Sequence, residues 1–270
     1  MLSAIDNFLD RITMYRLVLY VLTVLVAGAL VFSFFGWLPF SPIALGFSAL
    51  TLVAVCWSVN TLFAWVWEVP ANVESAYITA LILALIVAPP SRGNLASGLA
   101  LLFWVAVWSM AAKYLFAWRG KHMFNPAALA VALTALTVNQ SASWWVGTRI
   151  MLPLALLGGL LLVRKLRRFQ TVSLFLFSAL AVIVMTSRLS APVAVWRSFL
   201  DSPLIFFSAI MFTEPATCPT RRWSRAFYGL MVGLLFAPAV HIGSLYSTPE
   251  LALLAGNIFA FAANSSTPPA

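Results

Sequence analysis

Charge is rare in this sequence: Asp, Glu, Lys and Arg make up 9% of its 270 residues, whereas 63% are hydrophobic. A soluble globular domain of this length has no means of keeping so much apolar surface out of water. Soluble enzymes and soluble binding modules are therefore excluded, and we expect the chain to lie in a lipid bilayer. The net charge of +9 comes from short basic loops, which membrane topology explains better than nucleic-acid binding does.

Cysteine and histidine are also rare. Cys56 lies inside an apolar run and Cys218 stands apart from it, so the sequence has no disulfide framework and no paired cysteine ligands for a metal. His122 and His241 are expected on opposite membrane faces, which excludes a single haem held between them. No Walker loop, G-x-G-x-x-G or G-x-S-x-G motif occurs, so the catalytic motifs of soluble enzymes are missing.

Long apolar runs dominate what remains. Residues 17–38, 44–67 and 95–118 each reach the roughly twenty residues that cross about 30 Å of hydrocarbon as a helix. Seven further apolar segments cover residues 77–88, 124–138, 150–163, 171–187, 203–212, 226–243 and 250–263. The sequence therefore predicts an all-α polytopic membrane protein with about ten transmembrane helices.

Basic residues are distributed unequally between the two sides of this arrangement. With the N-terminus in the cytoplasm, eleven fall on the cytoplasmic side: Arg11, Arg16, Arg119, Lys121, Arg164, Lys165, Arg167, Arg168, Arg221, Arg222 and Arg225. Only four fall outside: Arg92, Arg149, Arg188 and Arg197. This bias places both termini in the cytoplasm. Residues 1–16 are expected to be a cytoplasmic amphipathic segment rather than a cleaved signal peptide.

Two of the apolar segments are too short to cross a bilayer as regular helices. The run "YITALILALIVA" (77–88) would be about 18 Å long, and "PLIFFSAIMF" (203–212) about 15 Å. Irregular backbone at membrane depth is tolerated only where protein or a polar cavity satisfies its amide and carbonyl groups. Each short run is therefore expected to be a half-helix that points into the protein interior.

The surroundings of the two short runs resemble each other. Glu74 precedes the first run and Asp201 the second, 127 residues later. Asn125 and Thr248, 123 residues apart, each precede a proline that opens a similar helix. Because the offset is nearly constant and each half holds five segments, we expect a 5+5 inverted repeat with paired broken half-helices.

The repeat also gives the expected domain organisation. Repeat one covers about 17–138 and repeat two about 150–263, and together they form a single membrane domain, 17–263. Residues 264–270 are polar and contain two prolines, which is typical of a disordered tail or of a linker to a further module.

Polar residues that flank the half-helices are the first candidates for function, because such groups are costly at membrane depth. They are Glu74, Ser75, Thr79, Asn125, Thr213, Glu214 and Thr217. Ser75 and Asn125 are expected at helix N-termini, whose free amides favour anions.

Structural roles compete with these functional ones. Glu74 and Asn125 would serve as helix caps, and Glu214 would pair with Arg221 or Arg222 at the membrane interface. Lys113, near the end of a span, would either extend to the headgroups or stabilise an anionic reduced cofactor, and the first is favoured.

Three stretches resemble a known family. They are "ESAYITALILALIV" (74–87), "KHMFNPAALA" (121–130) and "MFTEPATCPTRRWSRAFYG" (211–229). They are similar to the motifs of the membrane flavoprotein subunits that the sodium-translocating NADH:quinone reductase shares with the Rnf electron-transport complex. The resemblance covers roughly residues 15–263. The matching residues are Phe124, Asn125, Pro126, Ala127, Met211, Thr213, Glu214 and Pro215, with Glu214 where Asp is more usual.

This resemblance implies a fold akin to that of urea transporters, with a flavin, FMN or riboflavin, bound within a bacterial inner membrane. It further implies an electron relay between a cytoplasmic NAD(P)H-linked flavin reductase and a membrane or outer-side acceptor such as a quinone. The chain itself carries no hydride-accepting motif, so the reductase would be a separate domain or subunit.

One feature of the family is missing. Relatives often attach FMN through a threonine in a Ser-Gly-Ala-Thr type motif, but the corresponding loop here reads "NQSASWWVGTRI" (139–150). We therefore expect non-covalent flavin. Trp144 and Trp145 would stack on a flavin ring or, as we favour, anchor the chain in the lipid interface.

A rival function follows from the same architecture. An inverted repeat with broken helices equally suits a channel or transporter for a small solute or for flavin itself.

Overall fold

The protein is almost entirely helical. The computed structural model describes residues 6–7, 9–91, 93–118, 121–243 and 245–265. The longer helices are α2 (Met14–Phe34), α3 (Pro42–Val66), α4 (Val73–Ile86), α5 (Leu95–Leu115), α6 (Pro126–Thr137), α7 (Leu152–Leu166), α8 (Phe169–Thr186), α9 (Ala191–Leu200), α11 (Arg222–Phe236) and α12 (Pro249–Ser265). Between α9 and α11 lie the short α10 (Leu204–Phe206) and the π-helix η1 (Phe207–Met211).

Two small hairpins complete the described secondary structure. β1 (Ala117–Trp118) pairs with β2 (Lys121–His122), and β3 (His241–Ile242) pairs with β4 (Leu245–Tyr246), both antiparallel. The first hairpin leads from α5 into the start of α6, and the second lies between α11 and α12.

The helices confirm an all-α membrane protein. Four of them, α2, α3, α5 and α8, are long and apolar enough to cross a bilayer, and the pair formed by α9 and α10–η1 counts as a fifth if it is one bent span. That pair bends by 68°. Large apolar side chains such as Ile43 and Met185 are more than four-fifths exposed, as expected where lipid rather than water surrounds the protein.

Local sequence explains where the helices start. Ser41 precedes Pro42 at the start of α3, and its hydroxyl oxygen accepts a hydrogen bond from the Ala44 amide at 3.1 Å. Asn125 precedes Pro126 in the same way at the start of α6. Proline suits the first helical position because its fixed φ matches the helix and its missing N–H leaves no unsatisfied donor.

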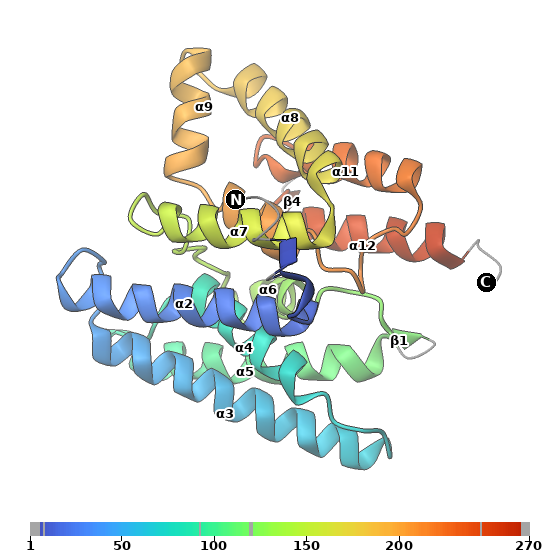
Figure 1. Ribbon diagram of the computed structural model, residues 1–270. Helices are drawn as coiled ribbons and strands as arrows, with labels where there is room; N and C mark the ends of the chain where they lie inside the picture. The colour runs from blue at the N-terminus through green and yellow to red at the C-terminus, as the bar shows by residue number, and fades with distance from the viewer. Residues whose placement is uncertain (1–5, 8, 92, 119–120, 244, 266–270) are drawn as a thin grey trace.

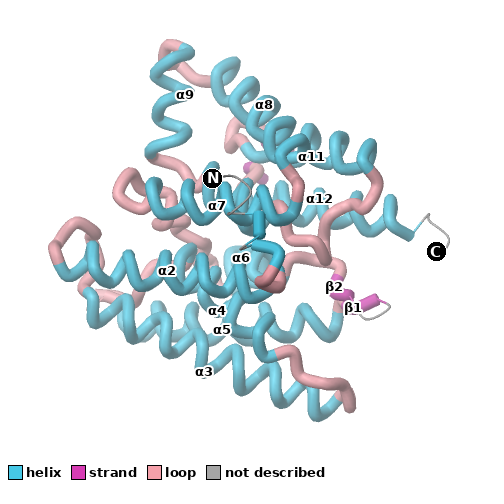
Figure 2. The backbone as a smooth tube through the Cα atoms, in the orientation of Figure 1, coloured by secondary structure: helices cyan, strands magenta, loops and turns pink. Residues whose placement is uncertain are grey.

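The chain packs as two groups of helices (Figure 1). In the first group, α3 packs against α4 and α5, α2 against α4, and α5 against α6. In the second, α8 and α11 form the most extensive helix pair, and α11 also packs on α12. Contacts of α2 with α7 and of α6 with α12 join the groups, so α6 lies near the centre of the molecule (Figures 1 and 2).

The end of the short helix α4 is buried, and the loop after α6 supplies its hydrogen-bond partners. The Ile86 carbonyl accepts hydrogen bonds from the Ser143 and Trp144 amides, both at 2.9 Å. The Trp145 indole N–H donates to the Ala84 carbonyl at 3.1 Å. Trp144 and Trp145 are only 9% and 6% exposed, so the prediction that they anchor the chain in the lipid interface was wrong.

The second short run, 203–212, differs from a simple half-helix. It begins as α10 and winds as a π-helix through η1, a form that is often found at functional sites. At its end the Phe212 carbonyl accepts hydrogen bonds from the Cys218 thiol at 3.0 Å and the Tyr228 hydroxyl at 3.2 Å. Buried polar side chains therefore replace the helical partners that this carbonyl lacks.

Three boundaries depart from the sequence-based predictions. α9 was not expected, because its residues include Arg197 and Ser198 and lack a long apolar run. The apolar segment 226–243 forms α11 only as far as Phe236, and a turn and the β3–β4 hairpin follow. α12 continues to Ser265, into the predicted tail, whereas residues 266–270 lie outside the described part of the chain.

Candidate functional site at the start of helix α6

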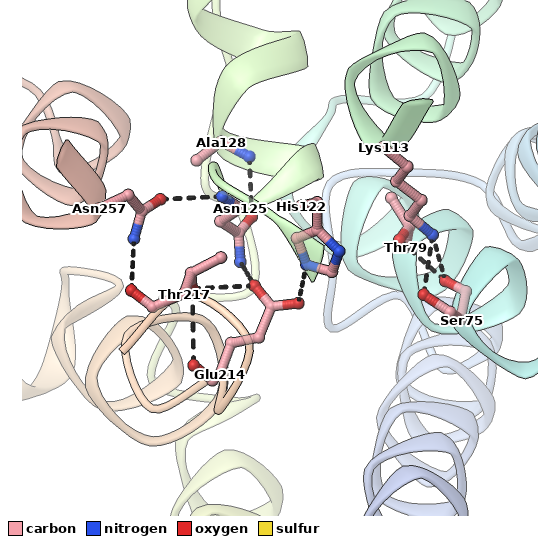
Figure 3. Close-up of polar contacts among 9 residues, drawn as sticks. All are labelled: Ser75, Thr79, Lys113, His122, Asn125, Ala128, Glu214, Thr217 and Asn257. Carbon is pink, nitrogen blue, oxygen red and sulfur yellow. Dashed lines mark hydrogen bonds and ion pairs between the residues drawn. The ribbon is translucent and has the colours of Figure 1, made fainter. Parts of the chain in front are cut away.

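Glu214, in the turn after η1, lies at the centre of a polar cluster (Figure 3). Its Oε1 is 3.0 Å from the His122 Nε2 atom. Its Oε2 accepts hydrogen bonds from the Asn125 side-chain amide at 2.8 Å and from the Thr217 hydroxyl at 3.2 Å. One carboxylate thus joins the turn after η1 to the segment that enters α6.

Asn125 and Asn257 extend this cluster to a third element (Figure 3). The Asn125 Oδ1 accepts the Ala128 amide at 3.0 Å and so caps α6. The Asn125 backbone N–H donates to Asn257 Oδ1 at 2.8 Å, and the Asn257 amide donates to the Thr217 carbonyl at 3.3 Å. We call Glu214, His122, Asn125, Thr217 and Asn257 the Glu214 cluster.

The Glu214 cluster is largely shielded from solvent. The Glu214 side chain is 26% exposed and that of His122 is 15% exposed. Burial disfavours the charged carboxylate, but the charge and hydrogen bond of His122, with help from Lys113 and Thr217, hold the pKa of Glu214 below its ordinary value of 4.5. The geometry therefore favours an ionised carboxylate in the interior of the protein.

Lys113 lies beside the Glu214 cluster, on α5 (Figure 3). Its ammonium group donates to the Ser75 carbonyl at 2.8 Å and to the Ser75 hydroxyl at 3.0 Å. The Thr79 hydroxyl donates to the same carbonyl at 2.9 Å. Lys113 therefore points inward, and the prediction that it extends to the lipid headgroups was wrong.

The charge of Lys113 has no direct counter-ion. Among the described residues no carboxylate lies within 4.0 Å of its ammonium group. It is held instead at the first turn of α4, where the helix dipole is positive and disfavours a cation. Two sources of positive potential thus coincide in the interior, near enough to Glu214 for Lys113 to favour its ionised form.

The remaining predicted residues are placed outside the Glu214 cluster or beside it. Glu74 is 44% exposed at its side chain and pairs with Arg16 at 3.4 Å, so it faces solvent. Ser75 does not cap α4, because Asn72 accepts the Ser75 amide at 3.0 Å. The Thr213 hydroxyl bonds back to the Ala209 carbonyl at 2.8 Å.

Phe124 and Pro126 support the start of α6. Phe124 packs edge-on against Phe116, with 5.6 Å between the ring centres, and Pro126 is buried at the first helical position. The expected pairing of Glu214 with Arg221 or Arg222 does not occur, because His122 takes that place.

A narrow cleft reaches the Glu214 cluster from the side of α2. Its polar end is formed by Asn125, Thr213, Glu214 and Pro215, and its apolar walls by Met14, Tyr15, Val18, Ile78, Ile82, Leu162, Leu166, Ala209 and Ile210. Its free volume is about 40 Å³. Ligand pockets usually measure roughly 300–1,000 Å³, so a ring system would enter only after side chains of the cleft move.

The lining of the cleft is divided by chemistry: apolar side chains form its walls, and polar side chains lie at one end. Each named polar side chain of the Glu214 cluster is already paired within the protein, so a ligand would exchange with these bonds. Among the described residues no three His, Cys, Asp or Glu side chains gather to hold a metal ion.

His122 and Asn257 are site residues that sequence reasoning missed. His122 was weighed only as a haem ligand, although it directly precedes the "FNPA" motif and so lies close to Asn125. Asn257 is a fully buried amide in an otherwise apolar helix, which was a visible signal. Its partner, 132 residues away, was not deducible from spacing alone.

Comparison with known proteins adds no family assignment. No protein-family model matches this chain, and no curated protein matches it.

Proposed function

We propose that this chain is a membrane-embedded electron-transfer domain that binds a flavin, FMN or riboflavin, without a covalent bond. It would relay electrons between a cytoplasmic NAD(P)H-linked flavin reductase domain or subunit and a membrane or outer-side acceptor such as quinone. The observation that carries the proposal is the buried polar junction at the start of α6, where Asn125 and Glu214 end an apolar cleft and Lys113 lies beside the Glu214 cluster.

The finer architecture is part of the same proposal. Ten crossings arranged as a 5+5 inverted repeat, akin to urea transporters, would place both termini in the cytoplasm of a bacterial inner membrane. The division of the helices into an α2–α6 group and an α7–α12 group supports two halves. The short α4, with 14 residues, and the bent η1 segment support interrupted helices in both halves.

Residues of the chain have distinct parts in this proposal. The bound flavin would supply the redox chemistry, and the protein supplies its position and electrostatics. Lys113 and the first turn of α4 provide positive potential that stabilises negative charge on a reduced ring. Asn125 and Glu214, at the polar end of the cleft, would contact the polar edge of the ring, and Tyr15 and Met14 lie at the walls that must move.

The visible spectrum of the purified chain tests the proposal. We expect flavin bands in the folded protein and release of free flavin on denaturation, at about one flavin per chain or another fixed small ratio. Glu214→Ala should lower the flavin content at least several-fold. Glu74→Ala is the matched control, since Glu74 is an exposed acid paired with Arg16. Protein that is colourless after mild extraction, also with added flavin, would refute the proposal.

A solute channel or transporter is the second candidate, supported by the same interrupted helices. Flux of a small solute, or of riboflavin, into liposomes that contain colourless protein would favour it. The cleft of about 40 Å³ requires rearrangement for a solute as it does for a flavin, so its volume does not separate the two candidates. Electron transfer comes first because the ionised Glu214 and the inward-pointing Lys113 lie at the junction of the interrupted helices.

A further inference from the structure

Two arginine-bearing segments lie side by side at one end of the molecule. Arg167 and Arg168 occupy the turn between α7 and α8, and Arg221, Arg222 and Arg225 occupy the start of α11. The close packing of α8 on α11 brings these segments together although they are about fifty residues apart in sequence. We call these five arginines the arginine patch.

Hydrogen bonds fix the two segments of the arginine patch to each other. Arg222 Nε donates to the Gln170 side-chain oxygen at 3.2 Å, and Arg168 Nη1 donates to the Pro219 carbonyl at 3.2 Å. Arg167 takes the left-handed conformation, with φ at 53°, in the turn that ends α7. The side chains of Arg168 and Arg222 are therefore held by the fold, and they join the two segments of the patch.

The charge of the arginine patch is not neutralised within the part of the chain that the structure describes. There, no carboxylate lies within 4.0 Å of any of the five guanidinium groups. The neighbouring Arg164 and Lys165 differ: Arg164 forms two bonds of 2.8 and 2.9 Å to Asp6, and Lys165 lies 3.7 Å from Asp10. The N-terminal acids thus neutralise α7 but leave the patch with five positive charges.

Exposed aromatic side chains lie beside these charges. Trp223, next to Arg222, is 85% exposed, and Phe169, next to Arg168, is 48% exposed. Phe169 is the first residue of α8, one of the four helices that are long and apolar enough to cross a membrane. Aromatic rings at the end of a membrane-spanning helix are typical of the headgroup level of the bilayer, which is also the level of the lipid phosphates.

A pocket adjoins the patch on the side of the N-terminal segment. It measures about 430 Å³ and is lined by Asp6, Leu9, Asp10, Arg164, Lys165, Arg167, Phe169 and Gln170. Asp6 and Asp10 are engaged by Arg164 and Lys165, which leaves Arg167 as the lining base without an acidic partner among the described residues. The pocket has room for a lipid headgroup, with its phosphate at Arg167.

We propose that the arginine patch and this pocket bind the phosphate of an anionic phospholipid headgroup. Clustered arginines next to a membrane span attract anionic lipid, and each contributes to binding. An acidic protein would also meet the charge requirement, but the exposed Trp223 and Phe169 at the same level match a bilayer interface better than a water-filled one.

Lipid titration of the detergent-solubilised full chain tests this site. Binding of a fluorescent phosphatidylglycerol in mixed micelles should exceed binding of the matched phosphatidylcholine. The triple variant Arg167→Gln, Arg221→Gln, Arg222→Gln should lose at least tenfold in phosphatidylglycerol affinity, since each charge contributes about fivefold. Arg188→Gln with Arg197→Gln is the control, because these arginines also lack an acidic partner among the described residues but lie elsewhere, Arg188 just after the other end of α8 and Arg197 in the last turn of α9.

A second variant is expected to raise phosphatidylglycerol affinity, so the test does not depend on correct folding of the triple variant. Asp6→Asn releases Arg164 into the pocket and should tighten phosphatidylglycerol binding by about fivefold. Equal binding of both lipids by the wild-type chain, or equal losses in the triple and control variants, overturns the proposal. Binding of acidic polypeptide without any preference for anionic lipid overturns it as well.

Discussion

At the residue scale, Glu214 shows how hydrogen-bond partners stabilise a single ionised side chain inside an apolar protein. Its two oxygens have three partners, contributed by two segments about ninety residues apart. A buried carboxylate that loses a hydrogen-bond partner still carries the full free-energy cost of its desolvation. Removing one partner of Glu214 should therefore lower the stability of the fold by more than the net contribution of one ordinary hydrogen bond. The Glu214 cluster is therefore expected to stabilise the start of α6 whether or not a ligand is bound.

The pH dependence of stability tests this expectation through Glu214→Gln. Because the pKa of Glu214 is lowered from 4.5 in the folded protein, its ionised form stabilises the fold above about pH 4.5, and this contribution is lost as the pH falls through the lowered value. Near neutral pH the variant should be less stable by about 1–3 kcal/mol. Thermal unfolding in detergent at several pH values measures the difference, which should shrink towards pH 4.

The control for this experiment is Glu74→Gln, whose carboxylate is exposed and pairs with Arg16. A surface pair of this kind contributes little, so its variant should unfold like the wild type at every pH. If Glu214→Gln and wild type differ equally at pH 4 and pH 7, the charge of Glu214 has no part in its stabilising role.

At the element scale, local signals were predictable and long-range partners were not. The Asn125–Pro126 start of α6 followed from cap chemistry, and the three longest spans followed from apolar length. The positions of Trp144 and Trp145 were predicted wrongly, because an aromatic pair in a loop is typical of a lipid interface. Nothing in the local sequence indicates that the Trp145 indole donates hydrogen bonds to carbonyl groups at the end of α4. The chemistry of an unpaired carbonyl is local, but the identity of its donor depends on tertiary packing.

The same limit explains Lys113 and Glu214. Glu214 was predicted to flank a short helix and Lys113 to lie near the end of a long span, yet their partners His122 and Ser75 are 92 and 38 residues away in sequence. Composition indicates that a buried charge must be paired, and only the fold decides with which residue.

The crossing of α8 and α11 depends on a glycine. A Cβ atom on Gly233 would collide with the Ser178 hydroxyl and with the Phe175 carbonyl oxygen, which belongs to the α8 backbone and has little room to move. Gly233→Ala should therefore destabilise the protein by about 1–3 kcal/mol or more, because the helices must separate. A fall in the thermal unfolding midpoint in detergent measures the effect.

Gly46→Ala is the matched control for the crossing. Gly46 lies in α3, and a Cβ there would meet only the Leu30 side chain, at 3.8 Å. Alanine in a helix is favoured over glycine by about 0.5–1 kcal/mol, so this variant should be neutral or more stable. Equal behaviour of the two variants would mean that α8 and α11 adjust their separation freely.

At the scale of the whole molecule, the polar groups that link the helices concentrate at one end of the α2–α6 group. Arg16 at the start of α2 meets Glu74 at the start of α4, and Lys113 near the end of α5 meets Ser75. The start of α6, with Asn125, follows α5 through the β1–β2 hairpin. If this end faces the cytoplasm, the proposed flavin lies within reach of a soluble reductase, and the arginine patch meets the inner leaflet.

The electron-transfer proposal requires one orientation of the chain in the membrane, with the Glu214 cluster towards the cytoplasm. Cysteine labelling measures this orientation. Both native cysteines are buried, so the wild-type chain should give little reaction with a membrane-impermeant maleimide. Ser190, between α8 and α9, and Ser265, at the end of α12, are exposed positions for single introduced cysteines. In the proposed topology an odd number of crossings precedes Ser190 and an even number precedes Ser265, so a single extra or missing span would reverse at least one of the two sites.

We expect Ser190→Cys to be labelled in intact cells and Ser265→Cys only after the membrane is permeabilised, because basic residues are far more numerous on the Ser265 side. Labelling of Ser265→Cys in intact cells would place the Glu214 cluster and the arginine patch on the outer face. A cytoplasmic reductase would then have no access to the cleft, and the electron-transfer proposal would fail while the fold remained unchanged.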